Sequence, residues 1–120
     1  MTNRKYEKYI LTDVNREYLA SLKVPQSIEE QRKAGNYIES TYMFHLDNSI
    51  LAGGFYTDCH WITSVKGNGG AQTEIAHTHD FGETLGFVGS NTADPRSLGG
   101  EIEFWLEDER YVIDRSCLIF

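Results

Sequence analysis

Two histidines and a glutamate in the segment 77–83 are the residues whose types and spacing could do chemistry. His77 and His79 are two positions apart, so on a β-strand both imidazoles leave the same face, and Glu83 follows after three intervening residues. Two neutral imidazole nitrogens and one carboxylate oxygen suit divalent Fe, Mn, Ni, Co or Zn, and they leave positions open for water or substrate. The spacing therefore predicts that His77, His79 and Glu83 bind a divalent metal ion.

A less specific interpretation competes with this one. A histidine pair of this spacing in a β protein is more often a surface or cross-strand pair than a metal site, and Glu83 alone could be an exposed turn carboxylate. The offset of the glutamate and the flanking Gly70 and Gly89 favour the metal site. Leu85 and Phe87 would then point inward beside Glu83 and exclude water from the ion.

The same segment resembles the first metal-site motif of the cupin family. In that family a glycine, about five residues, His-x-His, three or four residues, a glutamate and about six residues lead to a second glycine. Here Gly70 is followed by six residues, His77 and His79, three residues, Glu83, five residues and Gly89. Residues 98–106 also look like part of the small single-domain cupins. The resemblance covers roughly residues 50–120 and implies a jelly-roll β-barrel that holds the metal ion.

The later part of the chain departs from the cupin pattern. The second cupin motif, Pro-x-Gly-x-x-His, would supply a further histidine, but the prolines here are Pro25 and Pro95, and no histidine follows the first motif. His45, His60, water or a second chain could complete the ligand set. We favour a chain that is cut near Phe120, where the second motif should begin. Such a chain would be inclined to swap strands or to form a homodimer.

Two functional hypotheses from different classes follow. The first is a cupin-like metalloenzyme, a class that spans oxygenases, isomerases and decarboxylases, whose ion would polarise substrate oxygen atoms or activate dioxygen. The second is a non-catalytic cupin that binds a small ligand or acts as a sensor, with the metal absent or structural. The sequence offers no clear general base beyond the ligands themselves, and a fold does not choose a reaction. Both hypotheses therefore stay open.

Composition limits the partners and the location of the protein. A chain of 120 residues with 40% apolar residues suits one packed domain. Its net charge of −7, without a Lys/Arg cluster, makes it a poor partner for nucleic acid or anionic lipid. The first residues do not form a secretory signal, and no window approaches a membrane span. Cys59 and Cys117 are isolated, which favours free thiols. We expect a cytoplasmic protein that binds a small molecule.

Residues 1–40 are expected to form an N-terminal extension with one or two short helices. Residues 13–22 offer an N-cap and a few apolar positions at helical spacing. Residues 25–35 give a stronger signal, because Ser27 and Glu30 can form a capping box and Gly35 can end the helix. This second helix has little apolar face, so we expect it on the surface.

Residues 41–120 are expected to form the cupin-like β domain, incomplete at its C-terminal end. Short segments of β character recur between turn residues, which is typical of a sandwich or barrel. The fold class predicted is therefore all-β, a jelly-roll barrel or sandwich with a short helical extension. The predicted strands cover residues 42–46, 50–65 with a break at Gly53, 71–79, 83–88, 101–107, 111–113 and 117–120.

The other histidines, the tryptophans and an acidic stretch carry further predictions. His45 is expected on the surface at a strand end, and His60 could point into the barrel or out of it. Trp61 and Trp105 are most simply core or interface aromatics. The acidic residues between 101 and 109 are expected to form a solvated face.

Overall fold

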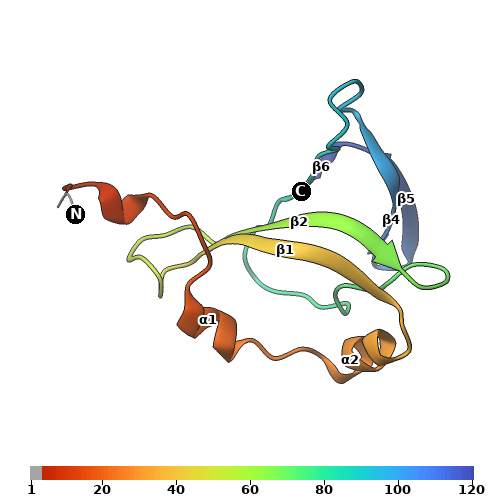
Figure 1. Ribbon diagram of the computed structural model, residues 1–120, viewed down its shortest axis with the longest axis horizontal. Helices are drawn as coiled ribbons and strands as arrows, with labels where there is room; N and C mark the ends of the chain where they lie inside the picture. Colours follow the sequence, from red (N-terminus) through yellow and green to blue (C-terminus); the bar gives the residue numbers. More distant parts are fainter. Residues whose placement is uncertain (1–3) are drawn as a thin grey trace. The chain divides into compact units, whose positions relative to one another are not determined.

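The computed structural model describes residues 4–120, and it is mostly β (Figure 1). Strands make up 37% and helices 15% of these residues, and every sheet is antiparallel. The chain divides into two compact units, residues up to 76 and residues 77–120. Each unit is described by itself below. The prediction of an antiparallel β protein with a helical N-terminal part is confirmed at this level.

The first unit contains a long hairpin preceded by short helices. Strands β1 and β2 pair antiparallel in a register that sets Ile38 opposite Val65 and Leu46 opposite Thr57, with two irregularities between them. The hairpin therefore brings the end of β1 beside the start of β2. The elements are η1 (Glu7–Tyr9), α1 (Arg16–Ser21), α2 (Gln26–Lys33), β1 (Tyr37–Leu46) and β2 (Thr57–Lys66).

The ends of α2 show one wrong prediction and one confirmed one. Pro25 occupies the N-cap, so Ser27 lies inside the helix and the predicted capping box does not form; Glu30 accepts instead from the Gln26 side chain, at 3.0 Å. Proline favours the start of a helix because its φ is fixed there, and this moves the start ahead of Ser27. Gly35 ends the helix as predicted. Its φ is +90°, its amide donates to Arg32, and the next amide donates to Gln31, which is the Schellman arrangement.

The second unit is built from two small antiparallel pairs. Strand β4 (Ser97–Leu106) pairs with β5 (Glu109–Arg115), and β3 (Leu85–Phe87) pairs with β6 (Cys117–Ile119). The β4–β5 turn places Glu107 at a φ of 55°, in the left-handed region. The acidic residues predicted to be solvated here are exposed.

The predicted strand over residues 71–79 is wrong, because these residues form a loop. Side chains bond some of its backbone polar groups. Gln31 on α2 accepts from the Gln72 amide at 2.9 Å and donates to the Gln72 carbonyl at 2.8 Å, and Glu74 accepts from the Ile75 amide. These contacts replace a strand ladder. The strands of residues 4–120 accordingly form three two-stranded sheets rather than a closed barrel.

Few side chains of residues 4–120 are fully buried. Val14 is 7% exposed and His45 is 1% exposed, whereas Trp61 and Trp105 are each 54% exposed. Of the two roles expected for the tryptophans, packing in a core is therefore wrong for the chain as described, and a role at an interface stays a prediction. None of the helices in this part of the chain combines the length and apolar character needed to cross a membrane.

Candidate functional site

The predicted metal-site segment lies in the loop that leads to β3, not on a strand. The Nε2 atom of His79 lies 2.7 Å from an Oε of Glu83, and the His77 ring centroid lies 5.7 Å from that of His79. The loop thus brings His79 and Glu83 into contact and leaves His77 beside them. Among residues 4–120, no group of three or more His, Cys, Asp or Glu side chains is arranged to hold a metal ion.

Phe81 positions the imidazole of His79. Its ring stacks on the imidazole with centroids 3.8 Å apart and an interplanar angle of 3°, and its carbonyl oxygen lies 3.1 Å from Nδ1. A carbonyl only accepts, so Nδ1 donates and Nε2 is the atom that faces Glu83. Metal-binding histidines are commonly oriented in this way, through the nitrogen that does not bind the ion. The donor set of His77, His79 and Glu83 therefore fits a divalent ion in its chemistry.

Gly89, the second glycine of the predicted motif, has a clear packing role. A Cβ atom on Gly89 would lie 1.8 Å from the carbonyl oxygen of Ser97. The Gly89 amide donates to the Ser116 hydroxyl at 2.8 Å, and that hydroxyl donates to the Pro95 carbonyl at 2.6 Å. Glycine is required here because two backbone segments meet at this position.

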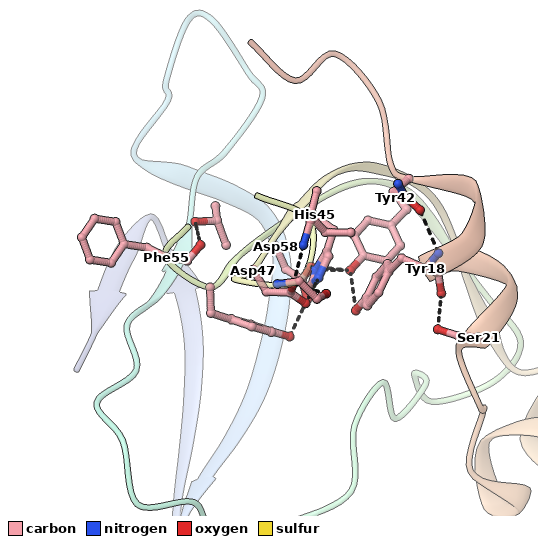
Figure 2. Close-up of polar contacts among 12 residues, drawn as sticks. Tyr18, Ser21, Tyr42, His45, Asp47, Phe55 and Asp58 are labelled. Atoms are coloured by element: carbon pink, nitrogen blue, oxygen red, sulfur yellow. Dashed lines mark hydrogen bonds and ion pairs between the residues drawn. The ribbon is translucent and has the colours of Figure 1, made fainter. Parts of the chain in front are cut away.

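A second cluster centres on His45 at the end of β1 (Figure 2). Its Nδ1 lies 2.6 Å from Asp58 on β2, and its Nε2 lies 2.8 Å from Asp47 in the turn after β1. The side chain is buried, so the expectation of a surface histidine is wrong. The ring can be buried because each of its nitrogens has a carboxylate partner, which offsets the cost of removing a polar ring from water.

Tyrosines complete the surroundings of His45. The ring of Tyr18 on α1 stacks on the imidazole with centroids 3.6 Å apart and an angle of 3°. Tyr42 donates a short hydrogen bond to Asp58, and Tyr56 donates to the same carboxylate at 2.8 Å. The cluster therefore joins α1, β1 and β2 (Figure 2).

Hydrogen bonds within this cluster shift the pKa values of His45, Asp47 and Asp58 towards their charged forms. Burial lowers the pKa of His45, but the hydrogen bonds to Asp58 and Asp47 outweigh it and raise the pKa above 6.5. The pKa of Asp47 is well below its usual value because Ser49 and then His45 donate to it. Burial raises the pKa of Asp58, but hydrogen bonds from Tyr42, His45 and Tyr56 bring it below the usual value. The hydrogen bonds to both carboxylates therefore favour the imidazolium form of His45.

The hairpin register could have revealed this cluster. His45 and Asp58 are paired Cα positions in β1 and β2, and Asp47 caps the turn by accepting from the amides of Ser49 and Ile50. The predicted second strand begins at residue 50, whereas β2 begins at Thr57, and the wrong start hides this pairing. The other hairpin histidine, His60, stacks on Tyr42 with centroids 4.0 Å apart.

Comparison of the chain with protein families, curated proteins and solved structures finds no match. Cys59 is exposed and Cys117 is half-buried, and neither is paired within its own unit. The chemistry and geometry of the side chains are therefore the basis for the function proposed below.

Proposed function

We propose that His77, His79 and Glu83 bind a divalent metal ion, and that the chain is a cupin-like enzyme of the oxygenase or isomerase type acting on a small molecule. The contact of 2.7 Å between Nε2 of His79 and Glu83 supports this proposal best. It brings two of the three predicted ligand atoms to one point, within the spacing that resembles the cupin motif.

Each residue has a stated part in the proposal. His79 would bind through Nε2, since the Phe81 carbonyl holds its other nitrogen as a donor. Glu83 would exchange its contact with Nε2 of His79 for the ion, and His77 would supply the second imidazole. A bound divalent ion would act as a Lewis acid towards substrate oxygen. Both side chains of the His79–Glu83 pair are partly exposed, at 25% and 40%, so solvent ions and ligands can reach them.

The jelly-roll architecture belongs to the same proposal. The antiparallel β3–β6 and β4–β5 pairs are compatible with it. The cytoplasmic location and the homodimer expected from the sequence stay predictions.

Equilibrium dialysis against Co²⁺ tests the metal proposal. We expect about one ion per wild-type chain, and less than roughly a tenth of an ion in the double variant His77→Ala/His79→Ala. Glu101→Ala is the control, because this exposed carboxylate of β4 is not among the candidate ligands and should leave binding unchanged. His60→Ala separately shows whether His60 completes the ligand set, since weaker binding would assign it as a further ligand.

The outcomes separate the proposals. Wild-type protein that binds less than roughly a tenth of an ion per chain contradicts the metal site, as does equal binding by the double variant. A chain that binds Co²⁺ but converts no small molecule would favour the alternative, a non-catalytic ligand-binding or sensor cupin.

A further inference from the structure

Residues 9–21, which we name the strap, lie against the end of the β1–β2 hairpin. Tyr9, Ile10 and Leu11 form one wall of a cavity of about 410 Å³, and the hairpin residues Phe44, His45, Leu46 and Thr57 form the other. The strap continues through buried Val14 to α1, where Tyr18 stacks on His45. The strap therefore faces the hairpin across the cavity at one end and contacts it through Tyr18 at the other, and His45 lies at both places.

Apolar contacts alone hold the strap weakly. Tyr9, Ile10 and Leu19 remain largely exposed, and Val14 is the one apolar side chain among residues 4–120 that is buried. Burial of apolar area is the usual source of adhesion between segments, at about 25 cal/mol per Å². A large share of the attachment must then come from the contact between Tyr18 and His45.

The position of the His45 ring depends on its charge. As an imidazolium it donates from Nδ1 to Asp58 and from Nε2 to Asp47. The neutral ring has a single N–H, so one of the two carboxylates would face a lone pair instead of a donor. The cation also attracts the face of the Tyr18 ring, an interaction that the neutral ring loses.

Every element that packs against His45 contributes to this balance. The turn provides Asp47, β2 provides Asp58, the residue before β2 is Tyr56, β1 provides Tyr42, and α1 provides Tyr18. His60 reaches the cluster only through its stack on Tyr42. In this set only the two aspartates are anionic at neutral pH. The protonated His45 ring places a positive charge between them, and loss of its proton removes that charge.

We infer that protonated His45 fastens the strap onto the β1–β2 hairpin, and that loss of this proton releases the strap and opens the cavity behind it. The raised pKa of His45 agrees in direction. A raised pKa means that the contribution is fully present below about 6.5 and is lost as the pH rises through the folded-state value. The strap is thus held more firmly below the folded-state pKa of His45 and released above it.

Hydrogen exchange and NMR on the full chain test this inference. Between about pH 6 and about pH 10, ¹⁵N spectra follow the protonation of His45, and exchange follows the α1 amides of Tyr18 and Leu19. After correction for intrinsic exchange, we expect protection of these amides to fall on the order of tenfold, with the same midpoint as the His45 titration.

Three variants make the test decisive. Asp47→Asn removes one carboxylate and should move both midpoints to lower pH, and His45→Gln should remove the pH dependence of α1 protection. His60→Gln should leave both midpoints in place. Should His45→Gln fail to fold, Asp47→Asn decides alone. A His45 that stays protonated to about pH 10 overturns the inference, and so does α1 protection that does not follow the titration.

Discussion

His45 and His79 lie in different units of the chain, yet their immediate surroundings are alike. Each imidazole is stacked on an aromatic ring at an angle of 3°, His45 on Tyr18 at 3.6 Å and His79 on Phe81 at 3.8 Å. Each also contacts a carboxylate at 2.6 to 2.7 Å. The difference is burial. His45 is 1% exposed and has two carboxylates, whereas the His79 side chain is 25% exposed and has one.

Burial changes what the same contacts can do. Water competes for the partners of His79, so its pairing with Glu83 adds little stability and can be exchanged for another ligand. His45 cannot recover lost partners from solvent, so each of its hydrogen bonds matters for folding. One arrangement of histidine, ring and carboxylate is therefore suited to binding, and the other to holding segments together.

The largest expected difference comes from removing each ring. His45→Ala should lower the opening free energy of the β1–β2 amides by about 2–4 kcal/mol, because it leaves a cavity and removes one donor from each of two aspartates. This loss of free energy is smaller than the loss expected when a fully buried ion pair is broken, because both aspartates are partly exposed. His79→Ala should lower the opening free energy of the β4–β5 amides by less than about 1 kcal/mol. Native-state hydrogen exchange measures both quantities.

His60→Ala is the control for loss of a ring from the same hairpin. It should cost about 1 kcal/mol or less, since it loses one aromatic contact and no charged partner. Equal losses for His45→Ala and His79→Ala would show that burial is not what distinguishes the two histidines.

Local sequence signals predicted the elements better than their pairing. Gly35 was identified as a helix end because a left-handed C-terminal position favours glycine, and the structure has φ +90° there. The β character of residues 42–46 and 101–107 also followed from composition and alternation. The capping box failed because Pro25 starts α2 earlier than Ser27 would. The strand predicted over residues 71–79 is wrong, because part of this backbone is bonded by a distant side chain: Gln31, 41 positions away, bonds both the amide and the carbonyl of Gln72.

In the candidate sites, too, the residue types could be predicted from local sequence and their spatial arrangement could not. The ligand types in segment 77–83 could be chosen from chemistry and spacing, but their geometry depends on a loop and on the ring of Phe81. The cluster at His45 was missed because it depends on register. Asp58 becomes its partner only when β2 begins at Thr57, and Tyr18 joins from a helix. Burial of a histidine cannot be inferred from its neighbours in sequence when its partners come from three elements.

Replacing the aromatic ring that stacks on His45 should have an intermediate effect on stability. Tyr18→Leu removes the stack on His45 and should lower the opening free energy of the β1–β2 amides by about 1 kcal/mol, within the range of aromatic pairs. Tyr18→Phe keeps the ring and removes a hydroxyl that lies 3.5 Å from that of Tyr42, so it should stay close to wild type. A loss as large in Tyr18→Phe as in Tyr18→Leu would assign the effect to the hydroxyl. Exchange of the same amides in the two variants decides between them.

The matching change on the exposed histidine should have the smallest effect on stability. Phe81→Leu removes the same kind of stack, but Phe81 is itself 59% exposed, so the opening free energy of the β4–β5 amides should change by less than about 0.5 kcal/mol. The expected loss is in binding, because the ring orients His79. Co²⁺ affinity in equilibrium dialysis should fall by roughly tenfold, while Phe81→Tyr should retain it. If Phe81→Leu instead destabilised its unit as much as Tyr18→Leu destabilises the hairpin, the two stacks would be equivalent, and burial would not separate a binding histidine from a structural one.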